Sequence, residues 1–278
     1  MRKWIVGALA LSLSWSASAQ ELPQPSPTAT INQRVGLTDF TVVYSRPSAK
    51  GRTIFGDLVP YGQVWRTGAN ACTILSSTSD FKMGGEEIKA GKYALFTIPE
   101  EGSWTIIVST QTNLWGNSGY DAANDVARFV VNTTESDFDE SFGIDFDAFT
   151  TNSAKLILEW ENTAVAIPVE VDSDAESAKN IAKALSDAKR SYRNAADFHS
   201  KQGDHEKALA LITTALELDP ENWYTNWVKA QVLAASGDFK AAKKQGKKAI
   251  DMGQAAYDSM GRTFTYRAGL EKDMKGWK

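Results

Sequence analysis

The chain has 278 residues, of which 42% are hydrophobic and 23% are charged, a balance that excludes collagen, coiled coils and extensive disorder. Its formal net charge of −4 gives no reason to expect nucleic-acid binding. The single cysteine, Cys72, excludes a disulfide framework and a cysteine-based zinc site. The length is sufficient for two domains of ordinary size.

The first 19 residues have the pattern of a secretory signal. Met1-Arg2-Lys3 is positively charged, an apolar run extends from Trp4 to Trp15, and Ala17-Ser18-Ala19 has the form of a cleavage site. The apolar run is shorter than the roughly 20 residues that a membrane-spanning helix needs. We therefore expect residues 1–19 to be a signal peptide, residues 20–29 to be a proline-containing linker, and the mature protein to be periplasmic or secreted without a membrane span.

Residues 30–171 predict an antiparallel β-sandwich. Apolar and polar residues alternate, and Gly, Pro or Asn interrupts them at intervals of roughly ten residues, as in two packed antiparallel sheets. Phe81–Met83 and Glu86–Ile88 flank Gly84-Gly85, which favours a tight hairpin turn. Further strands, to a total of roughly ten, are expected at residues 38–44, 92–98, 104–109, 126–131, 138–146, 154–160 and 165–171.

Four aspartates fall on one face of the predicted strand 138–146 and its ends: Asp137, Asp139, Asp145 and Asp147. Alternate residues of a strand are nearly 7 Å apart, and the loop glycine of an EF-hand is absent, so the spacing argues against a calcium site. We interpret this face as a solvated acidic surface.

Residues 175–270 predict a small helical-repeat domain. Asp172-Ser173-Asp174 offers a helix cap. Gly203-Asp204 and Gly237-Asp238 lie 34 residues apart, and the same offset relates three pairs of alanines: Ala196 and Ala230, Ala208 and Ala242, Ala215 and Ala249. This period, with small residues where helices cross, is similar to tetratricopeptide repeats. Lys229 and Gly246 depart from that pattern, which usually has large apolar residues there, and an alanine-rich bundle is the alternative.

The first helix of each repeat would line a groove. Its candidate protein-binding residues are Arg190, Arg193, Tyr224, Trp227 and Gln231, together with Asp197. The arginines would take a carboxylate of an extended peptide, and Trp227 would be an apolar anchor. The alternative is that this face packs against the protein's own β domain.

The segment from residue 44 to residue 70 carries four of the ten basic residues of an otherwise acidic domain, which has 20 acidic residues between positions 20 and 172. Guanidinium groups beside aromatic rings can clamp a carboxylate or phosphate, or frame a sugar. An alternative is a packed connection whose arginines bond backbone carbonyls and nearby acids. The candidate ligand-binding residues are Arg46, Lys50, Arg52, Tyr61, Trp65, Arg66 and Asn70.

Four motifs in the β domain carry a family resemblance. They are the run from Ser45 to Asn70, the sequence AGKYALFTIP at 90–99, NLWG at 113–116 and LEWENT at 158–163. With them the chain resembles an exported bacterial family known as domain of unknown function twenty-nine-eleven. The resemblance implies a β-rich domain over most of residues 30–171, followed in some members by a helical tail. It implies no reaction and no catalytic residues.

Catalytic signatures are missing from the sequence. There is no G-x-S-x-G motif, and the two histidines, His199 and His205, lack the i, i+4 spacing of a helical metal pair. Cys72 lies in an apolar stretch, as an inert buried thiol would. We predict no catalytic residue, no metal ligand and no cofactor.

These observations favour a non-catalytic ligand-binding or protein-interaction module of the cell envelope. Its loop would face a small anionic or sugar-like ligand, and its helices would face a protein partner. One alternative is a carbohydrate-active hydrolase or lyase that uses carboxylates and arginine in the β domain. Another is an assembly subunit, which would expose a large apolar patch on the helices.

Overall fold

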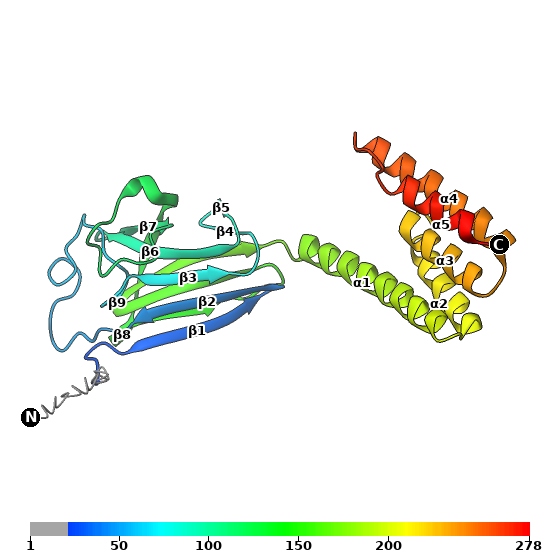
Figure 1. Ribbon diagram of the computed structural model, residues 1–278. Helices are drawn as coiled ribbons and strands as arrows, with labels where there is room; N and C mark the ends of the chain where they lie inside the picture. The colour runs from blue at the N-terminus through cyan, green and yellow to red at the C-terminus, as the bar shows by residue number, and fades with distance from the viewer. Residues whose placement is uncertain (1–21) are drawn as a thin grey trace, which may run out of the picture. The chain divides into compact units, whose positions relative to one another are not determined.

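The structure is a computed structural model that describes residues 22–278, and the predicted signal peptide lies outside the described residues. The chain divides into two compact units between Ser173 and Asp174, shown in Figure 1. Among the described residues, no helix is long and apolar enough to cross a membrane.

The first unit is an antiparallel sheet of nine strands in the order β1-β2-β3-β6-β7-β8-β9-β4-β5. A short 3-10 helix, Ala122–Asn124, precedes β8. The strands are β1 (Thr28–Val35), β2 (Thr38–Ser45), β3 (Thr73–Ser77), β4 (Phe81–Met83), β5 (Glu86–Ile88), β6 (Gly91–Pro99), β7 (Ser103–Ser109), β8 (Asp125–Asp147) and β9 (Ser153–Val171).

The sheet folds back on itself, so that its two parts enclose one core. Tyr44 on β2 reaches across the core to β8, where its Oη accepts a hydrogen bond from the Ile144 amide at 3.0 Å and donates to the Ile144 carbonyl at 3.3 Å. Phe40 on β2 packs edge-on against Phe81 on β4, with ring centroids 5.2 Å apart. Because strands distant in the sheet order meet face to face, the prediction of an antiparallel sandwich is confirmed.

Two strands are much longer than expected. The segments predicted as strands at 126–131 and 138–146 belong to one continuous strand, β8, and those at 154–160 and 165–171 form β9. The first part of β8 pairs with β7 and the rest with β9, and the β8–β9 register shifts on both sides of Asp139. Such irregularities bend a strand, which lets β8 pass from one layer to the other.

The hairpin predicted around Gly84-Gly85 is confirmed. β4 and β5 pair with Phe81 opposite Ile88, and the two glycines have φ of +59° and +90°. Residues other than glycine rarely adopt such positive φ values, which explains why both positions of this turn are glycine.

The second unit consists of helices whose repeat follows the 34-residue period. Asp204 and Asp238 cap their helices with the same φ and ψ, and each side chain accepts a hydrogen bond from an amide three residues on. The six alanines related by the period are all fully buried. The prediction of tetratricopeptide-like packing is therefore confirmed. The helices are α1 (Ser173–Lys201), α2 (His205–Leu218), α3 (Trp223–Ala235), α4 (Phe239–Ser259) and α5 (Arg267–Gly276).

The two departures from the repeat pattern have structural reasons. A Cβ at Gly246 of α4 would lie 2.9 Å from the Sδ atom of Met274, so the missing side chain makes room for α5. Lys229 on α3 donates through Nζ to the Thr213 hydroxyl of α2 at 3.3 Å. Its long stem thus spans the position where an apolar side chain would pack.

Candidate functional site

The long loop of residues 46–72 joins β2 to β3 and is fixed on the β unit. Trp65 and Thr97 of β6 exchange two backbone hydrogen bonds, of 2.7 and 2.9 Å. Gly68, at φ +148°, runs so close to β2 that a Cβ would lie 2.9 Å from the Ser45 carbonyl oxygen. A side chain at this position would push the loop off the sheet, so the loop geometry depends on this glycine.

Trp65 is the anchor of this loop in the core. Its side chain is buried, and its indole Nε1 donates to the Gly68 carbonyl at 3.0 Å. Its ring stacks on Trp160 of β9 at 6.0 Å and meets Trp104 and Phe142 edge-on, at 5.9 and 5.1 Å. Trp65 therefore forms a rigid wall rather than an open platform for a sugar.

Two of the predicted arginines bond backbone carbonyls. The Nε of Arg46 donates to the Phe142 carbonyl at 3.0 Å. Arg52 donates from Nε to the Ala49 carbonyl at 2.9 Å and from Nη2 to the Ser48 carbonyl at 2.6 Å. Both guanidinium groups hold the loop in shape, as the alternative interpretation of this segment expected.

Three other predicted ligand residues do not line the cavities at Arg66. Lys50 is exposed at φ +52°. Tyr61 is exposed at the surface, where partial burial and then three nearby glutamates raise its pKa. The Nδ2 of Asn70 donates to the Ser26 carbonyl at 3.2 Å and to the Ser45 hydroxyl at 3.3 Å, which shapes the loop.

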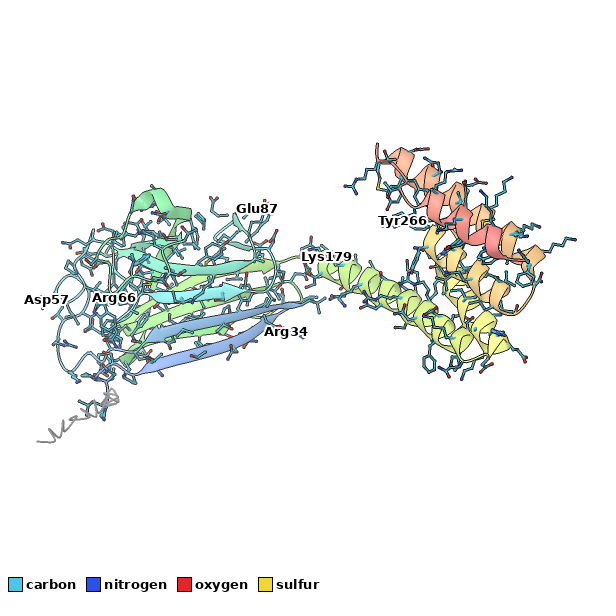
Figure 2. All side chains as sticks on the ribbon, in the orientation of Figure 1. Arg34, Asp57, Arg66, Glu87, Lys179 and Tyr266 are labelled. Atoms are coloured by element: carbon cyan, nitrogen blue, oxygen red, sulfur yellow. The ribbon has the colours of Figure 1, made fainter. Side chains whose placement is uncertain are left out.

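Arg66 differs from the other basic residues of the loop. Its Nε is buried and has no hydrogen-bond partner, and among the described residues no carboxylate forms an ion pair with it. Burial lowers the pKa of its guanidinium group. The loop at Gly116 passes close by, since a Cβ there would lie 3.3 Å from Nη1 of Arg66. Figure 2 shows Arg66 at one end of the β unit, with Arg34 at the other.

Two cavities adjoin the Arg66 side chain. Neither has an aspartate or glutamate in its lining, although the β unit as a whole is acidic. The larger, of about 240 Å³, is lined among others by Ser26, Arg52, Leu58, Trp65, Arg66 and Trp160. The smaller, of about 190 Å³, is lined among others by Leu58, Gln63, Arg66 and Asn117.

This arrangement has the chemistry of an anion site. Two guanidinium groups line the larger cavity, and no carboxylate there competes for them. The tryptophan walls lower the local dielectric constant, which strengthens the attraction for a negative charge. The linings contain no histidine, cysteine or carboxylate.

Several residues near Arg66 were not among the candidates predicted from the sequence. Trp160, Leu58 and Asn117 line the cavities, and Trp115, next to Gly116, is 73% exposed. The motifs LEWENT and NLWG contain Trp160 and Trp115, so the family resemblance was the signal that pointed to these positions. The proximity of Trp160 and Asn117 to Arg66 depends on contacts between segments far apart along the chain, which a single sequence does not reveal.

Four of the five predicted protein-binding residues of the helical unit are accessible at its surface. The guanidinium of Arg193 lies over the ring of Tyr224, 4.9 Å from its centroid, and Tyr224 is 46% exposed. Arg190 is exposed and pairs with Asp187 at 2.6 Å, and Gln231 is exposed. These four residues are accessible to a partner.

The prediction that Trp227 is an exposed anchor for a peptide is wrong. Trp227 is only 3% exposed, because its ring stacks on Trp277, which follows α5. The structure therefore places Trp227 in the packing between α3 and the C-terminal segment, and Tyr224 is the aromatic residue that remains at the surface.

The single cysteine and clusters of possible metal ligands are further candidates for chemistry. Cys72 is buried, and this burial raises the pKa of its thiol, which disfavours the reactive thiolate. No group of three or more His, Cys, Asp or Glu in the described part of the chain is placed to hold a metal ion.

Comparisons with known proteins identify both units. Residues 26–169 match the family described as protein of unknown function (DUF2911), which covers about half of the chain. Residues 199–255 match the tetratricopeptide repeat. Searches of curated proteins and of solved structures found no match.

Proposed function

The chain belongs to the DUF2911 family of proteins of unknown function, and we propose that it is an exported, non-catalytic binding protein of the cell envelope whose β unit binds a small anion at Arg66. The signal-like pattern of residues 1–19 supports export. The buried, unpaired Nε of Arg66, beside cavities without carboxylates in their linings, is the main support for an anionic ligand. Buried polar atoms are almost always paired, so this donor is available to a ligand.

The size of the cavities limits the ligand. Pockets for drug-sized molecules usually exceed about 300 Å³, whereas the larger cavity here has about 240 Å³. A carboxylate, phosphate or sulfate group on a small molecule fits this volume and the bidentate geometry of a guanidinium. A neutral sugar would leave the partly buried charge of Arg66 uncompensated.

The helical unit is the protein-interaction part of this proposal. Tetratricopeptide repeats present a groove to peptides, and Arg190, Arg193, Tyr224 and Gln231 supply charged and aromatic contacts on that side. The alternative of a carbohydrate-active enzyme requires carboxylates beside the arginine. Neither cavity at Arg66 has one, so no observation favours it.

A thermal-shift titration tests the anion site. The mature chain from Gln20, Arg66→Met and the control Arg34→Met are titrated with acetate, phosphate and sulfate, with sodium chloride at equal ionic strength as reference. Arg34 is an exposed arginine at the other end of the β unit, paired with Asp39. We expect a saturable rise in Tm for the wild type and Arg34→Met, and none for Arg66→Met. An unchanged response in Arg66→Met, or no response in any chain, would overturn the proposal.

A further inference from the structure

Positive charge is concentrated in the last two helices. Residues 239–278 contain ten lysines and arginines against four acidic residues, whereas residues 173–238 contain eight against ten. The excess positive charge of the helical unit therefore comes entirely from residues 239–278, which comprise α4, α5, their connection and the last two residues.

Five lysines form a stripe along α4. Their positions are i, i+3, i+4, i+7 and i+8, which lie on one face of a helix and extend over about 12 Å. The opposite face carries the buried residues Ala242, Gly246 and Ala249, so the stripe points away from the core. We call these residues the lysine stripe: Lys240, Lys243, Lys244, Lys247 and Lys248, all of them exposed.

The lysine stripe has no compensating charge within the described part of the chain. None of its five ammonium groups forms an ion pair there, whereas Lys183 and Lys201 on α1 each pair with an aspartate at 2.6 Å. Like charges at i, i+3 and i, i+4 repel each other along a helix. An anionic partner would relieve this repulsion.

A groove between α4 and α5 extends the stripe. Its cavity of about 560 Å³ is lined by Lys243, Lys247 and Lys275, with Ile250 and Met274 as apolar parts of the lining. Asp251 and Glu271 also line the groove, and Glu271 is paired with Arg267 at 3.2 Å. Basic and apolar residues in one lining can accept a phosphate-bearing headgroup with part of its attached chain.

We infer that α4 and α5 form a docking surface for an anionic phospholipid membrane. Lysines act as point charges that attract a charged surface without fixed geometry, whereas a specific carboxylate or phosphopeptide is usually read by the bidentate fork of arginine. All five members of the stripe are lysines, and no exposed aromatic residue stands between them to anchor a protein partner. The charge pattern therefore fits a lipid surface better than a protein. This inference does not depend on the anion site at Arg66.

Vesicle co-sedimentation tests this surface. The mature chain is mixed with phosphatidylglycerol-containing vesicles and with phosphatidylcholine vesicles, at low and high salt. The test variant is Lys243→Gln, Lys244→Gln and Lys247→Gln combined. The matched control is Lys183→Gln, Lys201→Gln and Lys207→Gln, which removes the same charge from exposed positions of α1 and α2. Each lysine near a charged surface contributes about fivefold to partitioning, so the test variant should bind roughly 100-fold more weakly.

Each outcome bears on the inference. Binding to the anionic vesicles alone, reversed by salt and lost in the test variant but retained in the control, would support it. Equal binding of both triple variants would show that net charge acts without the stripe, and would overturn it. Absence of vesicle binding would overturn it, and so would binding to soluble polyphosphate or polyglutamate without binding to vesicles. Circular dichroism checks that all chains keep their helical content.

Discussion

The ring of Trp227 stacks on that of Trp277, with centroids 5.4 Å apart and planes inclined by 26°. This contact places the end of the C-terminal segment against α3, the first helix of the second repeat. Two repeats bury too little apolar surface to be stable alone. The Trp227–Trp277 contact therefore adds packing to the repeat array, and Trp277 is partly buried in it.

Trp277→Ala should lower the free energy of unfolding of the helical unit by about 2 kcal/mol, because it removes a stacked and partly buried indole. Urea denaturation followed by the helical circular dichroism signal measures this change. Lys278→Ala, at the exposed neighbouring position, should stay within about 0.5 kcal/mol of the wild type. A loss no greater than that of Lys278→Ala would mean that the Trp227–Trp277 contact does not stabilise the array.

The two repeat caps should be energetically equivalent. Asp204→Ala and Asp238→Ala each remove a carboxylate that accepts a backbone amide with the same dihedral angles. Each substitution should cost about 1 kcal/mol of stability, measured by the same denaturation. Asp251→Ala, within α4 and outside its first turn, is the control for charge. A difference between the two caps well above 1 kcal/mol would contradict their equivalence.

Arg66 should cost the β unit stability when no anion is bound. Its half-buried guanidinium has an unpaired Nε, and Met has a similar length without the charge. Arg66→Met should therefore raise the stability of the β unit by about 1 kcal/mol in chloride buffer, as calorimetry would measure. Arg46→Met removes the bond to the Phe142 carbonyl and should be destabilising. If Arg66→Met destabilised the β unit to the same extent, Arg66 would be a structural arginine.

The ionised form of Glu159 should lower the stability of the β unit at neutral pH. Partial burial, followed by Asp139, Asp145 and Asp147, raises the pKa of its carboxyl group. A raised pKa means that the folded protein binds this proton more tightly than the unfolded chain does, so the charged form is destabilising at neutral pH. Stability is regained as the pH falls through the folded-state pKa.

Glu159→Gln should accordingly raise stability at neutral pH by a few tenths of a kcal/mol, since solvent and salt screen this partly exposed group. The gain should shrink as the pH falls toward the ordinary pKa of a glutamate, about 4. Thermal melts across this pH range measure the effect, with Glu135→Gln as control, on the neighbouring strand β8 that carries the three aspartates. An equal gain at all pH values would show that packing, rather than charge, causes it.

Local signals predicted local features well. The turn at Gly84-Gly85 was predicted from the backbone freedom of glycine, and the paired alanines of the repeats from close helix packing. The structure confirms both. The continuity of β8 did not follow from its sequence, because a polar stretch separates two apolar segments there and bulges keep them in one strand. The role of Gly246 depends on α5, which lies outside the repeat period.

The site was predicted at the level of a segment and not of a side chain. Composition marked the loop between β2 and β3 as basic and aromatic, and Arg66 is in it. Which arginine bonds a carbonyl and which is left unpaired depends on where Phe142 and Gly116 lie in space. That information is contained in the pairing of strands far apart along the chain.

The most direct measurement of the central proposal is the NMR resonance of the Arg66 Nε–H group during titration with acetate, phosphate and sulfate. If the β unit binds a small anion at Arg66, this resonance should shift downfield and saturate with one of these anions, because the unpaired donor gains an acceptor. The Nε–H resonances of Arg46 and Arg52, already bonded to carbonyls, should change little. An Arg66 resonance that stays fixed at saturating concentrations of all three anions would contradict the proposal.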